Sequence, residues 1–237
     1  MRLRVLVYNV HGFRDGVQDV VRVVRHFEPD LVLLNESGSR RSLRRFAKTL
    51  GMVVARDPWA PFRRRIKNAV LARPPWRIVK HRLHRFAEVR RPLNPRGALV
   101  AHVGRSGRRL WVLAIHLGLH PAERFHAAQE LADLARGLDG AVLIGGDCNE
   151  MPDGRAMAFL SDRFWDAWLL GGDAGGETYP ASDPTARIDY LFVSEELKVE
   201  RALVPSVMPE ARGASDHLPV VAELTLLEPG EPPPETR

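Results

Sequence analysis

Four short apolar runs in this chain each lead into a polar residue, and this arrangement constrains the fold more than any other feature. The runs are three or four residues long and end directly before Asn9 and His116, one residue short of Glu36 and two residues short of Asp147. Such runs are typical of buried strands, and in α/β folds the strand ends open into the crevice where ligands bind. One polar residue at a strand end is usually a turn former or a helix cap. Four of them predict a shared site.

Strands and helices are expected to alternate at both ends of the chain, with a strand-rich middle. Amphipathic helices are expected at about 16–27, 40–50 and 121–138, and strands at 3–9, 31–34, 52–55, 68–72, 77–80, 97–103, 110–116, 141–144, 188–193, 199–204 and 218–224. This order predicts one α/β domain over residues 1–227, with mixed sheets covered by helices. Residues 228–237 are rich in Pro and Glu and are expected to form a disordered tail.

Composition excludes several classes of protein. The 237 residues are 45% hydrophobic and 27% charged, which is ordinary for a globular chain and unlike a disordered one. No apolar run reaches the roughly 18 residues that a membrane-spanning helix needs. The single cysteine, Cys148, excludes an internal disulfide framework. The N-terminus is typical of a strand rather than a signal peptide, so the expected compartment is the cytoplasm. The oligomeric state stays open.

Positive charge is concentrated in the first half of the chain. Residues 1–110 carry 26 Lys and Arg against 7 Asp and Glu, a net of +19, whereas residues 111–237 have a net of −13. A basic half attracts polyanions; alternatively, the two halves fold together and their charges mix. The segment 57–67 favours nucleic-acid contact through Trp59, Arg63, Arg64 and Arg65. The alternative is a surface loop with one buried tryptophan. The cations of helix 40–50 are expected to be solvated.

Two further clusters contain residues with catalytic chemistry. Asp147 and Asn149 stand two positions apart in one segment, and Asp216 stands beside His217 just before the last strand. Asp189 lies one residue into an otherwise apolar strand, where an unpaired carboxylate would be costly. A histidine needs a carboxylate to fix its tautomer and stabilise its cation. The sequence therefore predicts that Asp189 pairs with His217.

Six motifs together resemble a known family. In chain order they are Tyr8-Asn9-Val10-His11-Gly12, Asp30 to Glu36, Ile115-His116-Leu117, Gly146-Asp147-Cys148-Asn149, Arg187 to Phe192, and Ser215-Asp216-His217-Leu218-Pro219-Val220. This order is similar to that of the endonuclease/exonuclease/phosphatase superfamily, the deoxyribonuclease-I-like metal-dependent phosphoesterases, from about residue 3 to residue 225. The resemblance implies a four-layer α/β sandwich with two central mixed β-sheets and a site at one edge.

The resemblance also implies roles for individual residues. Glu36 corresponds to the main Mg²⁺ ligand with Asn9 beside it, and Asp216 lies near the metal. Mn²⁺ is expected to substitute for Mg²⁺. Asn35 stands where the family usually has glutamine, and Cys148 where it usually has an aromatic residue. Both departures are interpreted as packing variation around the site.

The implied catalytic residues are five. Asp147 orients or deprotonates the attacking water, and Asn149 holds a phosphate oxygen. His217 contacts the scissile phosphate and is oriented by Asp189. His116 is directed at the phosphate or the leaving oxygen.

The residue types fit this chemistry independently of the resemblance. Phosphoester hydrolysis needs a hard cation with oxygen ligands, an activated in-line water and donors around the developing charge. No zinc-type Cys/His spacing, P-loop or nucleophile elbow occurs in the sequence. The first hypothesis is a Mg²⁺-dependent phosphodiesterase, in particular a nuclease. The alternatives are a hydrolase of small or lipid-borne phosphoesters, such as an inositol phosphate or a phospholipid head group, and a non-catalytic binding module.

Overall fold

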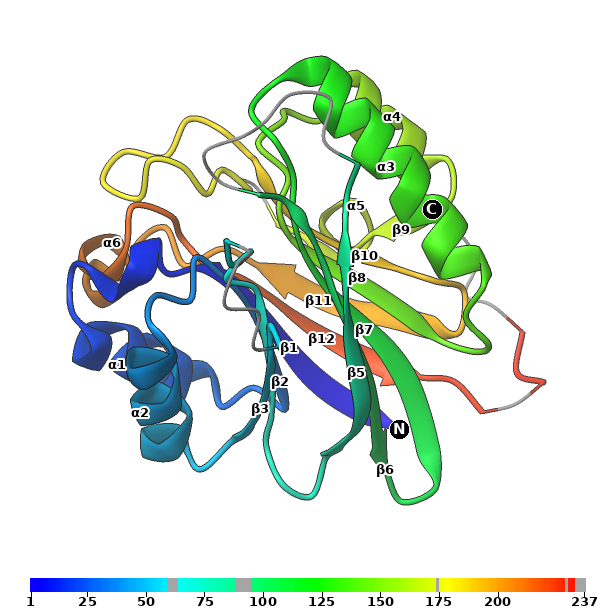
Figure 1. Ribbon diagram of the computed structural model, residues 1–237, viewed down its shortest axis with the longest axis horizontal. Helices are drawn as coiled ribbons and strands as arrows, with labels where there is room; N and C mark the ends of the chain where they lie inside the picture. The colour runs from blue at the N-terminus through cyan, green and yellow to red at the C-terminus, as the bar shows by residue number, and fades with distance from the viewer. Residues whose placement is uncertain (59–63, 88–94, 174, 229, 233–237) are drawn as a thin grey trace.

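Two six-stranded sheets stack face to face in the computed structural model, which describes residues 1–58, 64–87, 95–173, 175–228 and 230–232 (Figure 1). The first sheet has the order β11 (Leu197–Leu203), β12 (Val220–Leu226), β1 (Arg2–Asn9), β2 (Leu31–Asn35), β4 (Ala69–Ala72) and β3 (Val53–Arg56). The second has the order β5 (Arg77–Arg85), β6 (Gly97–Arg105), β7 (Arg108–His116), β8 (Val142–Asp147), β10 (Asp189–Val193) and β9 (Trp165–Asp166). Both sheets mix parallel and antiparallel pairs.

Helices cover the outer face of each sheet. The first sheet packs its outer side chains against α1 (Val17–Phe27), α2 (Arg40–Leu50) and α6 (Pro209–Ala214). The second packs against α3 (Pro121–Arg136) and α4 (Arg155–Ser161). A third apolar cluster, which includes Val7, Leu33 and Leu191, fills the space between the sheets. The predicted four-layer sandwich with two central mixed sheets is confirmed.

Strand register explains why the polar residues meet. In the first sheet β1 and β2 run parallel and pair Asn9 with Asn35. In the second, β7 and β8 run parallel and pair His116 with Asp147, while the antiparallel β10 places Asp189 opposite Asp147. Parallel neighbours end at the same edge of a sheet. The four predicted strand ends therefore lie at one edge of the sandwich.

Sequence patterns missed the shortest elements. The structure adds η1 (His11–Phe13), α4, α5 (Ala167–Gly171), α6 and β9, each too short to show a helical or strand period. The third helix ends at Arg136 and buries mainly alanines, rather than ending near residue 138. Within the described residues, no helix is both long and apolar enough to span a membrane. The predicted tail is described only at residues 228 and 230–232.

Candidate active site

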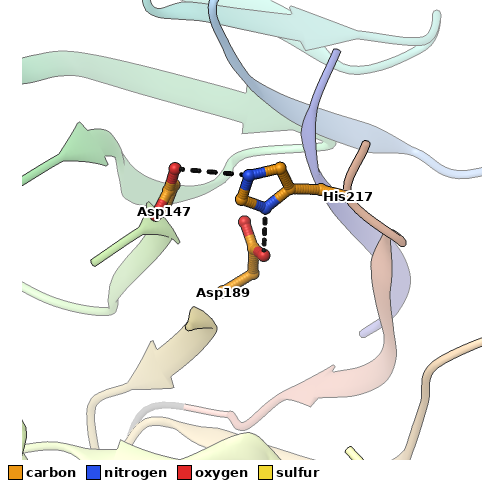
Figure 2. A group of neighbouring side chains, drawn as sticks. All are labelled: Asp147, Asp189 and His217. Atoms are coloured by element: carbon orange, nitrogen blue, oxygen red, sulfur yellow. Dashed lines mark hydrogen bonds and ion pairs between the residues drawn. The ribbon is translucent and has the colours of Figure 1, made fainter. Parts of the chain in front are cut away.

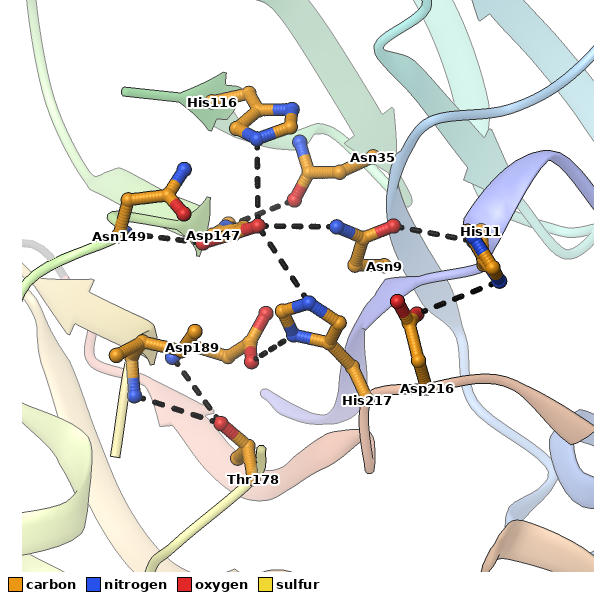
Figure 3. A network of polar contacts seen from close by, with 12 residues as sticks. Asn9, His11, Asn35, His116, Asp147, Asn149, Thr178, Asp189, Asp216 and His217 are labelled. Atoms are coloured by element: carbon orange, nitrogen blue, oxygen red, sulfur yellow. Dashed lines mark hydrogen bonds and ion pairs between the residues drawn. The ribbon is translucent and has the colours of Figure 1, made fainter. Parts of the chain in front are cut away.

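Asp147 lies at the centre of the site, at the end of β8, and is almost completely buried. Its Oδ2 accepts a hydrogen bond from Asn9 Nδ2 of the other sheet at 3.0 Å, and its Oδ1 accepts one from the backbone N–H of Asn149 at 2.9 Å (Figure 3). Two histidines also face Oδ2: His116 Nε2 at 3.3 Å and His217 Nε2 at 3.8 Å. The predicted catalytic residues of both sheets therefore converge on one carboxylate.

His217 is held between two carboxylates (Figure 2). Its Nδ1 lies 2.8 Å from Oδ2 of Asp189, so the ring is oriented with Nε2 toward Asp147. The backbone N–H of Asp189 donates to the Thr178 hydroxyl at 3.3 Å, and the ring of Tyr179 packs against the imidazole with centroids 4.9 Å apart. The structure contains the Asp189–His217 pair that the cost of a buried carboxylate predicted.

The charges of the site stabilise one another. Burial disfavours the Asp147 carboxylate, but His116, His217 and Asn9 outweigh this and hold its pKa well below the usual range. Burial also disfavours the His217 cation, yet Asp189, Asp147 and Asp216 raise its pKa to about 9. At neutral pH the site therefore contains an anionic Asp147 facing a cationic His217.

The residues implied for the metal gather beside this centre, around the segment 9–12. The backbone N–H groups of Val10 and Gly12 donate to the carbonyls of Asn35 and Glu36 at 3.2 and 2.9 Å. Ser215 Oγ donates to the Asn9 carbonyl at 2.7 Å, which places Asp216 next to this segment, with its Oδ1 3.8 Å from His11 Nδ1.

These residues fit a hard cation. The Glu36 side chain is partly exposed and its carboxylate has no hydrogen bond or ion pair with the described part of the chain. Among the residues that the structure describes, Asn9 Oδ1 accepts only the N–H of His11, at 3.1 Å, which leaves a lone pair available. Unpaired carboxylate and amide oxygens are the donors that Mg²⁺ prefers.

A second grouping of metal-type donors lies within the described residues. Ligand atoms of Asp147, Asp189 and His217 all lie within 4.8 Å of one another (Figure 2). His217 already contacts both carboxylates, and its raised pKa keeps it protonated at neutral pH. A metal at this grouping would have to displace that proton, and His217 Nδ1 is already bonded to Asp189. His217 is therefore assigned as a donor to phosphate rather than as a metal ligand.

Sequence reasoning missed two residues of the site. Arg96, directly before β6, places Nη1 2.7 Å from His116 Nε2. Its pKa is lowered by burial, although Asp147, Glu36 and Glu123 stabilise the charge. Nothing in the sequence distinguished this arginine from the many others.

Asn35 is the second missed residue, and it links the two sheets (Figure 3). Its Oδ1 accepts from the backbone N–H of Asp147 at 2.8 Å, and its Nδ2 donates to the Ile115 carbonyl at 2.6 Å. The interpretation of Asn35 as packing variation was therefore incomplete, because its amide positions the central aspartate. Its place directly before Glu36 was the available signal.

The remaining predicted residues are placed as follows. Asn149 reaches Asp147 through its backbone and donates Nδ2 to the Leu117 carbonyl at 3.1 Å. Cys148 is fully buried, and burial raises the pKa of its thiol, in agreement with a packed rather than reactive cysteine. Arg64 and Arg65 lie within the described chain, whereas Trp59 and Arg63 lie outside the described residues.

The sequence model of the endonuclease/exonuclease/phosphatase family matches residues 6–217. The chain belongs to this family. Its members are phosphoester hydrolases, so the protein is a metal-dependent phosphoric ester hydrolase. No curated protein sequence matches the chain significantly.

Solved structures share the fold at low identity. A mannosyl-6-phosphatase from Bacteroides thetaiotaomicron is 21% identical, with 94% of this chain and 99% of that chain covered and a TM-score of 0.79. Zebrafish (D. rerio) TDP2 complexed with single-strand DNA product is 17% identical, with the same coverages and a TM-score of 0.78. The human Nocturnin catalytic domain with bound sulfate is 19% identical, covers 94% of each chain and has a TM-score of 0.72.

Proposed function

We propose that this protein is a Mg²⁺-dependent phosphodiesterase that cleaves nucleic acid. The observation that carries the proposal is the meeting of both sheets at Asp147, with a histidine–carboxylate pair on one side and the unpaired Glu36 carboxylate nearby. Burying charged groups costs folding free energy, and such groups cluster at functional sites. The buried Asp147, Asp189 and His217 therefore favour an enzyme over a non-catalytic binding module. The cytoplasmic location expected from the sequence remains part of the proposal.

Glu36, Asn9 and Asp216 would hold the metal ion. Mg²⁺ supplies Lewis-acid stabilisation of the oxygens around phosphorus when it is bound. The chain itself contributes three oxygen donors at one strand edge. The Asn9 amide also donates to Asp147 through Nδ2, so one side chain links the metal residues to the catalytic carboxylate.

Asp147 and His217 would act on one phosphate. The anionic Asp147 accepts a hydrogen bond from the attacking water and activates it for in-line attack. The cationic His217, with Nδ1 on Asp189, directs its Nε2–H to a phosphate oxygen. Asn149 and Arg96 supply further donors around the charge that develops in the transition state. His116, whose Nε2 accepts from Arg96 Nη1, lies beside Asp147 for contact with the phosphate or the leaving oxygen.

A nucleic acid is the favoured substrate because the basic N-terminal half has a net charge of +19 and supplies Arg96, which contacts His116 in the site. A small phosphoester, such as an inositol phosphate or a phospholipid head group, is the second candidate. The similarity to a mannosyl-6-phosphatase favours it, since that neighbour acts on a phosphosugar.

The first test is a substrate panel of DNA, RNA, abasic DNA, phospholipid, inositol phosphate and mannose 6-phosphate, each with Mg²⁺ or Mn²⁺. Hydrolysis of DNA or RNA that excess chelator abolishes is the expected result. Full activity in excess chelator would contradict the metal requirement. Turnover of only the small phosphoesters would replace the nuclease by the second candidate.

The second test changes the catalytic residues. Asp147→Asn and His217→Ala are each expected to lower turnover by roughly 10²–10⁴-fold, the usual contribution of a general base or a transition-state donor. The double variant should lose much less than the product, because both groups act on one transition state. Single-turnover kinetics measures the effect, and circular dichroism controls for folding. A folded Asp147→Asn protein within about threefold of wild-type turnover would contradict the assignment.

A further inference from the structure

Three arginines converge next to the loop that follows Glu36. They are Arg40 at the start of α2, Arg56 at the end of β3, and Arg65; we call them the arginine cluster. Arg40 Nη2 donates to the carbonyls of Asp57 and Pro58 at 3.0 and 2.8 Å. Arg40 was expected on a solvated helix face and turns inward instead, whereas Arg41 and Arg45 of the same helix are exposed.

The arginine cluster has little negative charge of its own. Asp57 is the carboxylate that pairs with it in the described part of the chain, with Oδ2 3.8 Å from Arg65 Nε. That oxygen already accepts the backbone N–H groups of Ile66 and Lys67 at 2.8 and 3.0 Å. Within the described residues, this carboxylate pairs with Arg65 alone, whereas Arg40 contacts the backbone carbonyl of Asp57.

Donor atoms of the arginine cluster are buried without acceptors. Arg56 Nη1 and Arg65 Nε and Nη2 have no hydrogen-bond partner among the described residues. Burial and the nearby charges of Arg44, Arg40 and Arg65 lower the pKa of Arg56. Burial likewise lowers the pKa of Arg65, and Arg40 adds to this effect against the attraction of Asp57. Unsatisfied buried donors and crowded like charges both cost stability, and a bound anion removes both costs.

The arginine cluster lies close to the proposed metal residues along the chain and in space. Arg65 Nη1 donates to the Gly38 carbonyl at 2.9 Å, and the Gly38 N–H donates to the Glu36 carbonyl at 2.6 Å. The Ser37 N–H donates to the Lys67 carbonyl at 2.9 Å, which ties the segment after Arg65 to the same loop. Arg65 keeps 22% of its side chain exposed, so an anion can reach the arginine cluster from solvent.

We propose that the arginine cluster binds a second, non-scissile phosphate group of the substrate. The inference rests on the proposed function, because it assumes that the scissile phosphate lies at Asp147. Arginine suits this task because its planar fork pairs with two phosphate oxygens at once. The substrate class that follows is a strand with several phosphates, such as an oligonucleotide, rather than an ester with one phosphate.

The test compares substrates with one and with several phosphates. Bis(p-nitrophenyl) phosphate carries one phosphate, and a single-stranded hexanucleotide carries five linking phosphates. R56Q/R65Q should lower kcat/KM for the hexanucleotide by about tenfold or more, as the loss of charge-assisted hydrogen bonds implies. Its kcat/KM for bis(p-nitrophenyl) phosphate should fall much less than its kcat/KM for the hexanucleotide, since Asp147 and His217 are intact and this substrate has no second phosphate. R41Q/R45Q is the matched control, because it removes the same charge from exposed positions of α2.

Hexanucleotide binding in chelator, measured by fluorescence anisotropy, separates this inference from the proposed function. In one outcome, wild type hydrolyses neither substrate but binds the hexanucleotide about tenfold more tightly than R56Q/R65Q does. Phosphate binding by the arginine cluster would then be supported, and the catalytic proposal would fail. If wild type hydrolyses both substrates and R56Q/R65Q matches R41Q/R45Q in kinetics and binding, the arginine cluster is not a phosphate site. An equal loss of kcat/KM on both substrates would also overturn the inference.

Discussion

At the scale of single residues, the site depends on amides as much as on charges. Asn9 and Asn35 come from adjacent positions in the register of β1 and β2, and each contacts Asp147 across the gap between the sheets. Asn35 is fully buried and also bonds to the Asn68 side chain at 3.1 Å. Asn9 donates to the Asp147 carboxylate and Asn35 accepts from the Asp147 backbone N–H, so both position this residue without adding a charge to the buried site.

Glu36→Gln should weaken Mg²⁺ binding by at least about tenfold, because it replaces a charged ligand by a neutral one. The free energy of unfolding without metal should change little, since the Glu36 carboxylate has no hydrogen bond or ion pair with the described residues and interacts with the Arg96 charge only at longer range. Calorimetric titration with Mg²⁺ measures the first effect and urea denaturation the second. Asp189→Asn is the comparison variant. Loss of metal binding in Asp189→Asn but not in Glu36→Gln would place the metal among Asp147, Asp189 and His217.

His217 should make stability depend on pH. Its pKa is raised from 6.5 to about 9 in the folded protein, mainly by Asp189 against the opposing effect of burial. The protonated His217 therefore stabilises the folded state fully below about pH 6.5, and this contribution is lost as pH rises through about 9. Its contribution to the free energy of unfolding is at most about 3 kcal/mol. Urea unfolding without metal at pH 6 and pH 9.5 should show this loss in wild type and a smaller one in His217→Gln. Equal losses in both proteins would mean that other groups titrate in this range.

At the scale of elements, β8 is the strand on which the site depends. It brings Asp147 to the edge, and two glycines let it approach its neighbours closely: Gly145 faces Val7 and Leu33 of the other sheet, and Gly146 lies against Ile115 of β7 in its own sheet. A Cβ at Gly145 would lie 2.6 Å from Val7 Cγ2 and 3.2 Å from Leu33 Cδ2. A Cβ at Gly146 would lie 1.8 Å from the Ile115 carbonyl oxygen. Only glycine lets the sheets and strands approach this closely.

Gly145→Val should destabilise the fold by about 1–3 kcal/mol, the usual cost of overpacking a close-packed core. It should also lower turnover, because the sheets must separate beside Asp147. Gly213→Ala in α6 is the control, since a Cβ there meets no atom within 4 Å and alanine favours a helix. Urea denaturation measures the free energy of unfolding of both variants. A Gly145→Val protein as stable as Gly213→Ala would show that the two sheets are not tightly packed at this position.

At the scale of the whole molecule, the charge asymmetry of the sequence becomes partly a spatial one. β3, β4, β5 and β6 all come from the basic half of the chain and lie at the same end of the two sheets, where β3 packs against β5. The acidic half supplies the strands at the opposite end of each sheet. These are β11 and β12 in the first sheet and β10 and β9 in the second. The halves mix where β1 meets β12, as in the ion pair of Arg4 with Glu223 at 2.9 Å.

Binding of single-stranded DNA should therefore fall steeply with salt. Contact with about three phosphates predicts a slope of log K against log salt near −2, at about −0.7 for each phosphate. Raising salt from 50 to 200 mM should then weaken binding by at least about tenfold, and R56Q/R65Q should flatten the slope by about one. Fluorescence anisotropy in chelator measures both. An affinity for single-stranded DNA that does not change with salt, or no detectable binding at low salt, would favour the small-phosphoester alternative.

Local pattern determined most of the elements and the identity of the central residues. These features depend only on neighbours in the sequence: apolar runs of strand length, the helical period of α1 and α2, and polar residues at strand ends. The polar residues at strand ends identified Asn9, Glu36, His116 and Asp147. Asp189 was identified because a carboxylate in an apolar strand needs a partner, and His217 is that partner. The cost of burying a charge applies in any fold.

Only the tertiary structure decided which ordinary-looking polar residues take part. Arg96 contacts His116 from 20 positions away, and Asn35 bonds to Asp147 from 112 positions away. Arg40 turns inward while Arg41 is exposed. Composition and periodicity cannot separate one arginine or asparagine from another, because its partners are set by how two sheets and their helices pack. The sequence therefore predicted a site residue where a buried charge must have a partner. It did not predict residues such as Arg96, whose partner depends on how the layers pack.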